Sequence, residues 1–189
     1  MRKIILSLHT TLDGFVAGLN GEMDWIKFDD EMFDFVGKFT DEADTALYGR
    51  KTYQMMENYW PAAADKPDAT KHDIDHSQWY NKVNKVVLSR TMQIKGSGKT
   101  TFISDNIFSE INKLKHQTGK NILIFGSPTA AHSLMEENLI DDFWLFVNPV
   151  LLGQGIPLFA RIKGRINLRP LMTKVFPCGV TALHYTLDK

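Results

Sequence analysis

Two adjacent cations stand at the start of a predicted helix. The stretch TALYGRKTYQMM, residues 45–56, changes at Gly49 from a short apolar strand to a helical pattern, so Arg50, Lys51 and Thr52 occupy the first helical turn. The helix macrodipole disfavours cations at this end, whereas the free N–H groups there bind anions. These residues predict a site where a polyanion meets both cations and Gly49 lets the backbone approach it closely. The alternative is a solvated pair of cations that the helix tolerates.

Two other predicted strand ends carry groups suited to phosphate. One strand ends in Leu-Ser-Arg at 88–90, and another continues into FGSPTAA at 125–131. Because ligands of parallel sheets sit beyond the carboxyl ends of the strands, we expect the three junctions to face one groove. A pyrophosphate with an additional phosphate would use all three. The separate cations at Arg50, Lys51 and Arg90 favour NADPH over NADH.

The elements that must position these junctions alternate along the chain. Apolar strands are expected at 3–12, 45–49, 84–90, 121–126 and 140–152, with amphipathic helices between most of them. Such alternation predicts an α/β fold with a mixed, mainly parallel sheet flanked by helices. The segment 171–187 predicts an antiparallel C-terminal hairpin, and the polar segment 62–78 predicts a surface loop. The length of 189 residues predicts a single domain, 1–189.

Composition narrows the functional class. Lys plus Arg and Asp plus Glu number 22 each, which argues against nucleic acid or an anionic membrane as partner. The single cysteine, Cys178, is typical of a reducing compartment. The first apolar run is too short and interrupted for a signal sequence or a membrane span, so we expect a cytoplasmic protein.

The order of motifs resembles a known family. TTLDGFVAG, LYGRKTYQ, KVVLSRT, ILIFGSPTAAHSL and LIDDFWLFVNPVLLGQGIPLF follow one another as in the dihydrofolate reductase-like superfamily. The similarity covers roughly residues 2 to 187. It is greatest to the branch that includes the reductase domain of riboflavin biosynthesis and many stand-alone bacterial proteins. The resemblance implies that superfamily's fold, NADPH as cofactor and a homodimer.

The resemblance also implies roles for individual residues. Ser127 stands where the related glycine pair has its second glycine, which would narrow the space for the cofactor. The GQGIPLF segment is expected to shape the substrate cleft, together with Trp25. The implied cofactor contacts are Ala17, Gly18, Gly49, Arg50, Lys51, Thr52, Leu88, Ser89, Arg90, Gly126, Ser127, Pro128, Thr129 and Ala130; the implied substrate contacts are Trp25, Gly153, Gly155 and Pro157.

A carboxylate is expected as proton donor. In classical members of the superfamily an acid lies early on the first helix, a few residues after a tryptophan. Asp29, Asp30 and Asp34 follow Trp25 here, and Asp30 has the closest spacing. The alternative is structural: Asp29 caps the helix, and Asp30 and Glu31 are first-turn acids. The lysine usual in the first strand of the riboflavin branch is absent, which argues against a ribose-phosphate pyrimidine as substrate. Asp13 is expected to be a structural loop residue.

We therefore expect an NADPH-dependent reductase that transfers hydride to a small heterocyclic or carbonyl/imine substrate, dihydrofolate- or pyrimidinone-like. The alternative is a nucleotide-binding or sensory module of the same fold without turnover. KGSGKTT, residues 95–101, lacks the first glycine of a P-loop and is predicted to be a hairpin-like loop. HDIDH, 72–76, has the histidine spacing of a zinc site but no evident third ligand, so no metal is expected. His9 is predicted to be a core or cleft histidine.

Overall fold

A computed structural model describes residues 1–92, 98–160, 162 and 164–188. Its strands are β1 (Ile4–Thr11), β2 (Phe15–Ala17), β3 (Ala43–Gly49), β4 (Asn84–Leu88), β5 (Thr100–Ile103), β6 (Asn121–Phe125), β7 (Asp142–Asn148), β8 (Ile156–Pro157), β9 (Leu168–Val175) and β10 (Thr181–Leu187). Its helices are α1 (Asp30–Asp41), α2 (Arg50–Tyr59), the 3-10 helix η1 (Trp60–Asp65), α3 (Lys71–Lys82), α4 (Ile107–His116) and α5 (Pro128–Glu136).

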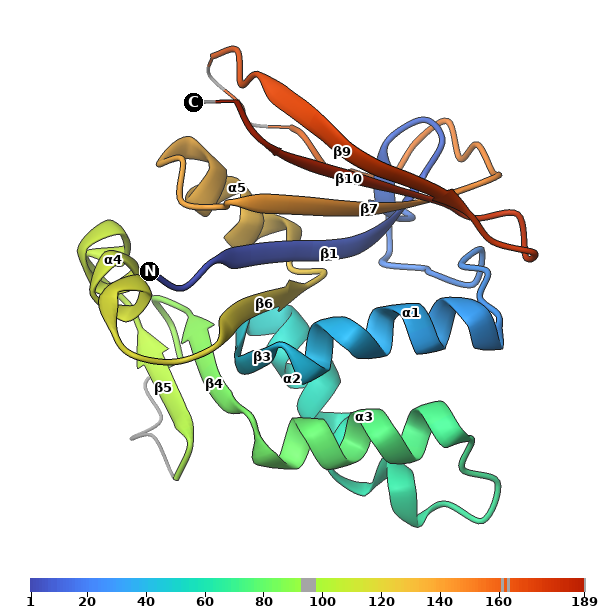
Figure 1. Cartoon of the computed structure of the whole chain (residues 1–189), viewed down its shortest axis with the longest axis horizontal. Helices are drawn as coiled ribbons and strands as arrows, with labels where there is room; N and C mark the ends of the chain where they lie inside the picture. Colours follow the sequence, from blue (N-terminus) through green and yellow to red (C-terminus); the bar gives the residue numbers. More distant parts are fainter. Residues whose placement is uncertain (93–97, 161, 163, 189) are drawn as a thin grey trace.

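The strands form an eight-stranded mixed sheet, ordered β5-β4-β3-β6-β1-β7-β10-β9 (Figure 1). Every neighbouring pair from β5 to β7 is parallel, and β10 runs antiparallel to both β7 and β9. Strands β2 and β8 form a separate two-stranded ribbon. The predicted mainly parallel sheet with an antiparallel C-terminal hairpin is confirmed. The carboxyl ends of β1, β3, β4 and β6 consequently meet at one edge.

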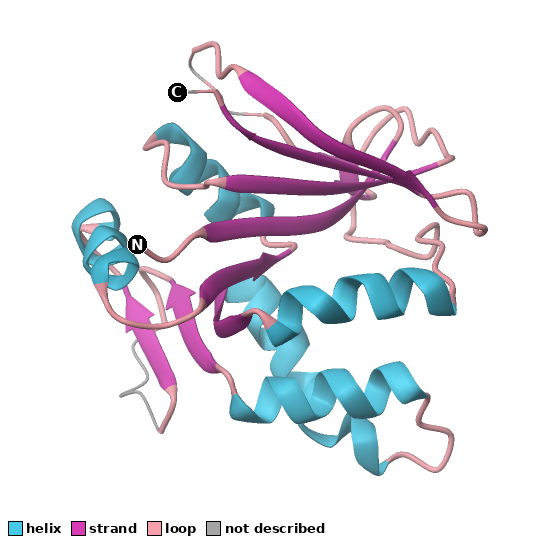
Figure 2. Cartoon of the chain, viewed as in Figure 1, coloured by secondary structure: helices cyan, strands magenta, loops and turns pink. Residues whose placement is uncertain are grey.

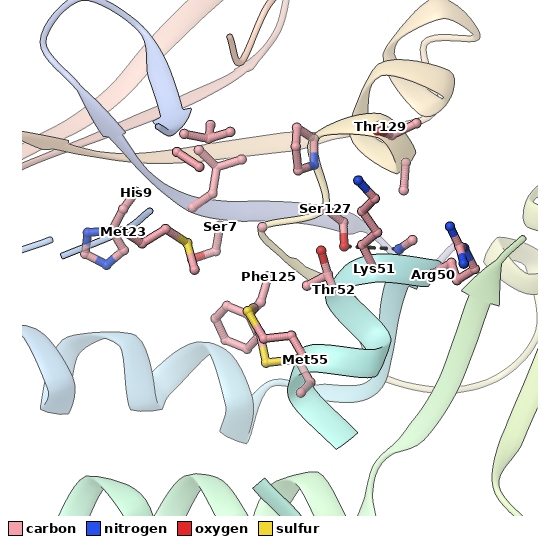
Figure 3. Close-up of a pocket in the computed structure, with 18 of the residues that line it drawn as sticks. Ser7, His9, Met23, Arg50, Lys51, Thr52, Met55, Phe125, Ser127 and Thr129 are labelled. Carbon is pink, nitrogen blue, oxygen red and sulfur yellow. Dashed lines mark hydrogen bonds between the residues drawn. The ribbon is translucent and has the colours of Figure 1, made fainter. Parts of the chain in front are cut away.

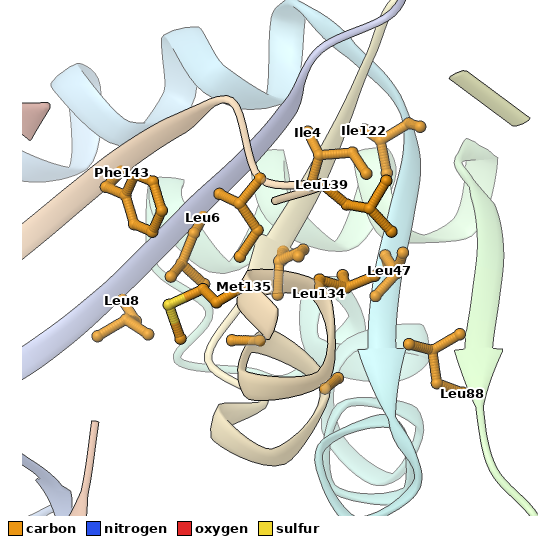
Figure 4. Close-up of a cluster of buried hydrophobic side chains, with 14 of the residues drawn as sticks. Ile4, Leu6, Leu8, Leu47, Leu88, Ile122, Leu134, Met135, Leu139 and Phe143 are labelled. Atoms are coloured by element: carbon orange, nitrogen blue, oxygen red, sulfur yellow. The ribbon is translucent and has the colours of Figure 1, made fainter. Parts of the chain in front are cut away.

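One face of the sheet buries aliphatic side chains against α4 and α5. Ile4 of β1 lies beside Ile122 of β6, and Leu134 and Met135 of α5 pack onto this face (Figure 4). Burial of such a side chain contributes about 1.5–3 kcal/mol. This face therefore holds α5, and with it the junction that follows β6, in a fixed position.

The opposite face carries an aromatic cluster under α1. Phe35 and Phe39 of this helix contact Trp144 of β7 at ring-centroid distances of 5.3 and 5.0 Å. Asp29 caps the helix by accepting a hydrogen bond from the Met32 N–H at 2.8 Å, and it also accepts one from the Cys178 N–H. The structural interpretation of Asp29 as an N-cap is thus confirmed, and the cap ties α1 to the β9–β10 turn.

The prediction of a surface loop over 62–78 is wrong. Within this stretch, η1 continues to Asp65 and α3 begins at Lys71, as the helices in Figure 2 show. Thr70 and Asp73 form a capping box, which is a recognisable sequence signal for a helix start. The helical pattern is weak because α3 buries polar residues, His76 and Ser77, beside Tyr80.

The stretch 95–101 also differs from expectation. Residues 95–97 lie outside the described part of the chain, but Thr100 and Thr101 begin β5, which pairs in parallel with β4. A hairpin joins antiparallel strands, so the hairpin interpretation is wrong. A P-loop requires a helix after the lysine, and a strand follows Lys99 instead. Among the described residues no helix is both long and apolar enough to cross a membrane.

Candidate functional site

A cavity of about 940 Å³ opens at the carboxyl ends of β1, β3, β4 and β6 (Figure 3). Arg50 at the start of α2, Ser89 after β4 and Ser127 before α5 all line it. The three junctions therefore meet around one space, as the strand order requires. Of the residues expected to contact the cofactor, all except Gly18 line this cavity.

A hydrogen bond joins two of these junctions. The Gly49 N–H donates to Ser127 Oγ at 3.0 Å, drawn as a dashed line in Figure 3. Ser127 is buried, and its backbone is left-handed, with φ 56° and ψ 57°. That conformation costs a non-glycine residue about 1–2 kcal/mol. The Ser127 hydroxyl thus satisfies a backbone N–H at the start of α2 and locks the two helix starts together.

Packing does not require glycine at position 49. The backbone there has φ −81°, which any residue adopts. A Cβ added to Gly49 would meet the Ala130 Cβ at 3.5 Å, an ordinary contact. Packing between protein segments therefore does not explain Gly49, and the expected close approach of its backbone to a bound anion stays a prediction.

The cavity is electropositive at this end. Arg50, Lys51 and Arg90 line it, and none of them forms an ion pair with another described residue. In the described part of the chain, no Asp or Glu lines the cavity. The first N–H groups of α2 and α5 lack intrahelical partners. An anion entering here meets cations and N–H donors, and no carboxylate of a described lining residue competes with it.

Ser89 has a local structural role. Its Oγ accepts hydrogen bonds from the Met92 N–H at 2.9 Å and the Thr91 N–H at 3.3 Å. This arrangement turns the chain sharply after β4 and directs Arg90 to the cavity. No described residue accepts a hydrogen bond from the Ser89 hydroxyl, so its proton is available as a donor there.

The other end of the cavity is apolar and aromatic. Sequence reasoning missed these residues as a site, although several follow helical spacing: Met23, Ile26, Met32, Phe33, Val36, Met55, Met56, Trp60, His72, His76, Phe125 and Phe146. They come from the segment before α1, from α1, α2, η1 and α3, and from strands β6 and β7, so only the packing of these elements brings them together. The cavity thus combines a cationic end with an apolar end.

His72 and His76 are part of this aromatic wall. The His72 ring stacks on Phe33 at 3.9 Å, and the His76 ring lies 4.0 Å from Trp60. Burial lowers the pKa of His76 to about 3, so its ring is neutral at neutral pH. No group of three or more His, Cys, Asp or Glu side chains suited to a metal occurs among the described residues.

The residues expected to contact the substrate do not line the cavity: Trp25, Gly153, Gly155 and Pro157. Ile156, between two of them, does line it. A Cβ on Gly155 would clash with the Ala17 carbonyl oxygen, so Gly155 permits close packing of β8 on β2. Gly18 likewise lies outside the lining, and a Cβ there would clash with the Glu22 carboxylate.

Asp13 holds the loop that precedes β8. Its carboxylate accepts hydrogen bonds from the Gly153 N–H at 2.7 Å and the Leu152 N–H at 3.1 Å, and from the Thr11 hydroxyl at 2.6 Å. These bonds, that of Thr11 foremost, lower the pKa of Asp13. Asp13 therefore has the structural role expected from the sequence.

The acid expected from the sequence does not reach the cavity. Asp30 is exposed in the first turn of α1 and is absent from the cavity lining. Asp34, one turn later, is exposed and pairs with Lys71 of α3 at 3.0 Å. The Asp29 cap orients the helix so that Met32, Phe33 and Val36 face the cavity. A proton-donating role for Asp30 gains no support from this placement.

Comparison with known proteins gives a consistent result. Residues 2–182 match the family described as RibD C-terminal domain. The chain is 41% identical over 186 residues to the uncharacterized protein YyaP of Bacillus subtilis (strain 168), covering 97% of this chain and 94% of YyaP.

Two solved structures share the fold. A protein from Shewanella sp. PV-4, provisionally ascribed to riboflavin biosynthesis, superposes with a TM-score of 0.77 at 22% identity, covering 100% of both chains. Dihydrofolate reductase from Enterococcus faecalis, in complex with NADP(H) and RAB-propyl, gives a TM-score of 0.65 at 13% identity, covering 99% of this chain and 97% of that one. At these identities the likeness concerns the fold alone.

Proposed function

Because the chain belongs to the RibD C-terminal domain family, we propose that it is an NADPH-dependent reductase of a small heterocyclic or carbonyl/imine compound. The observation that carries this proposal is the convergence of Arg50, Lys51 and Arg90, with two helix N-termini, on one cavity that no described carboxylate lines. A dinucleotide with an extra phosphate has the charge and length to use all of these groups.

The residues present fit NADPH. The N–H groups at the starts of α2 and α5 suit the pyrophosphate, and the guanidinium groups of Arg50 and Arg90 suit the additional phosphate. Ala17 would lie along the nicotinamide. When bound, NADPH would supply a hydride to an electrophilic carbon. The chain's own part is to align that carbon and to exclude water with its apolar wall.

The apolar end of the cavity sets the substrate class. Its methionine, phenylalanine and tryptophan side chains suit an uncharged planar compound, and Met55 and Met56 adapt to its shape. Apart from Arg50, Lys51 and Arg90, no Lys or Arg is found among the described lining residues. A dihydrofolate-like or pyrimidinone-like ring fits this end better than a ribose phosphate does.

A second candidate function is a nucleotide-binding or sensory module without turnover. It is favoured by one observation: the described lining residues include no carboxylic acid that could donate a proton. The same fold and the same cationic end would then serve binding alone.

We further propose a cytoplasmic homodimer. The single cysteine suits a reducing compartment. Leu171, Met172 and Val175 expose apolar side chains on the edge strand β9, and an exposed apolar edge favours pairing with a second chain. Light scattering coupled to size exclusion should give twice the mass of the chain; Val175→Lys should shift it to the monomer, and a monomeric wild type would refute the dimer.

Two measurements test the proposed function. NADPH fluorescence should change on mixing with the protein and saturate. Absorbance at 340 nm should then fall when dihydrofolate, a pterin or a quinone is added. Saturable NADPH binding without oxidation of any of these compounds would favour the binding module. Absence of NADPH binding would refute both candidates.

A further inference from the structure

His9 stands in the wall of the cavity, away from the phosphate-binding groups. It follows Ser7 by two residues on β1, so both side chains face the same side of the sheet and both line the cavity. In Figure 3 His9 and Met23 lie at one end of the cavity and Arg50 lies at the other. The His9 ring stacks on Phe146 with a centroid distance of 5.3 Å, which restricts its rotation.

A fully buried amide fixes which nitrogen of His9 carries the proton. Asn148 is 0% exposed, and its Oδ1 accepts a hydrogen bond from the Lys27 N–H at 2.8 Å. Its Nδ2 donates to the Phe146 carbonyl at 3.1 Å and points to the Thr10 carbonyl at 3.4 Å. These backbone partners leave one orientation for the amide, with Nδ2 toward β1 and β7.

That orientation determines the tautomer. Asn148 Nδ2 lies 3.2 Å from His9 Nδ1 and can only donate to it. Nδ1 must therefore be unprotonated, and in a neutral ring the proton resides on Nε2. Within the described residues Nε2 has no hydrogen-bond partner. Burial lowers the pKa of His9 to about 4, so the ring is neutral at neutral pH.

We propose that His9 is a substrate-binding residue whose Nε2–H donates a hydrogen bond to the heteroatom of the bond that is reduced. This inference rests on the proposed reductase function and specifies its substrate: an uncharged planar compound in which the reducible carbon is double-bonded to an acceptor oxygen or nitrogen. A cationic ring at this position is excluded, because a neutral donor with no described carboxylate beside it in the cavity offers no counter-charge.

The role of His9 follows from the charge that reduction creates. When the carbon gains a hydride, the π pair of the C=O or C=N bond moves to the heteroatom, which becomes negative and takes a proton. A neutral imidazole N–H stabilises that developing charge without itself being ionised beforehand. Because loss of Nε2–H would leave an imidazolate, water supplies the proton that the product keeps. His9 thus orients and polarises the substrate.

The first test reads the tautomer directly in the free protein. Long-range ¹H–¹⁵N correlation spectra should show a pyridine-type Nδ1 and a pyrrole-type Nε2 for His9 from pH 6 to pH 8. Dihydrofolate, a pterin or a quinone should then shift the Nε2 resonance. A pyrrole-type Nδ1, or an Nε2 resonance that none of these compounds shifts, would overturn the assignment whatever the activity.

The second test separates this inference from the proposed function. His9→Phe keeps a flat ring without a donor, and His9→Gln restores an amide donor. NADPH affinity should stay within about twofold of the wild type in both variants. The kcat/KM for the compound that accepts the hydride should fall roughly ten- to a hundredfold in His9→Phe and recover in part in His9→Gln. Equal kcat/KM in His9→Phe and the wild type would overturn the role of His9 alone. Failure of the wild type to bind NADPH would overturn the function.

Discussion

Ser127 Oγ accepts a hydrogen bond from the Gly49 N–H across two strand-to-helix junctions that are far apart in the sequence. The bond makes the first turns of α2 and α5 a single unit facing the cationic end of the cavity. This chain thus accepts a strained backbone at Ser127 and gains a connection between the starts of α2 and α5.

Replacing Ser127 separates the strain from the hydrogen bond. Ser127→Ala keeps the left-handed backbone and leaves the Gly49 N–H unsatisfied, so the free energy of unfolding should fall by about 1–3 kcal/mol. Ser127→Gly also loses the bond but relieves about 1–2 kcal/mol of strain, so it should stay near the wild type. Urea denaturation measures both. Equal destabilisation by the two substitutions would mean that the left-handed backbone at residue 127 does not lower the stability of the wild type.

Removing Arg50 should discriminate between the two nicotinamide cofactors. Arg50→Ala should weaken NADPH binding by roughly tenfold and NADH binding by less, because only NADPH carries the additional phosphate. Fluorescence titration measures both dissociation constants. Lys38→Ala, which removes an exposed cation of α1 outside the cavity lining, is the matched control and should change neither. An equal loss for the two cofactors contradicts the assignment of Arg50 to that phosphate.

Neighbouring aspartates at the start of α1 should behave differently. Asp30 is exposed outside the cavity lining, so Asp30→Asn should leave kcat/KM within about twofold of the wild type. Asp29 caps the helix, and Asp29→Ala should lower the free energy of unfolding by about 0.5–2 kcal/mol. A large loss of turnover in Asp30→Asn, with unchanged stability, would restore Asp30 as the acid.

His76 makes stability depend on pH. Its pKa is lowered by burial to about 3, below the usual value of 6.5, so the unfolded chain binds a proton that the folded chain does not. The contribution of the neutral His76 ring to the free energy of unfolding is therefore fully present above pH 6.5 and is lost as the pH falls toward 3.

His76→Phe removes the titrating ring and with it this dependence on pH. Between pH 7.5 and pH 4.5 the free energy of unfolding should decrease in both proteins, and the decrease should be smaller in the variant by roughly 1–3 kcal/mol. His116→Gln, at an exposed position, is the control and should retain the wild-type dependence. Denaturation series at the two pH values measure the difference, and identical slopes for His76→Phe and the wild type would exclude His76 as the cause.

Gly155 should be more sensitive to a methyl group than Gly164. A Cβ at 155 clashes with the Ala17 carbonyl oxygen, so Gly155→Ala must displace the β2–β8 ribbon and should cost about 1–3 kcal/mol. Because Ala17 lines the cavity, NADPH affinity should fall as well. A Cβ at Gly164 meets nothing within 4 Å, so Gly164→Ala should be neutral. Thermal unfolding and fluorescence titration compare the pair.

The sequence by itself determined the sheet and the cationic end of the cavity. Continuous apolar runs such as NILIF, residues 121–125, predict strands buried on both faces, and their alternation with helices predicts parallel order; the structure confirms both. Parallel order then places Arg50, Arg90 and Ser127 at one edge, because the carboxyl ends of such strands point the same way.

Only the tertiary structure decided what faces the substrate end. The direction of α1 depends on the Asp29 cap and on the aromatic packing of Phe35 and Phe39, and a rotation of this helix would exchange Asp30 for Phe33 at the cavity. The tautomer of His9 depends on Asn148, which is 139 residues away in the chain. Local spacing records neither relationship, since both arise from contacts between elements that meet only when the sheet is complete.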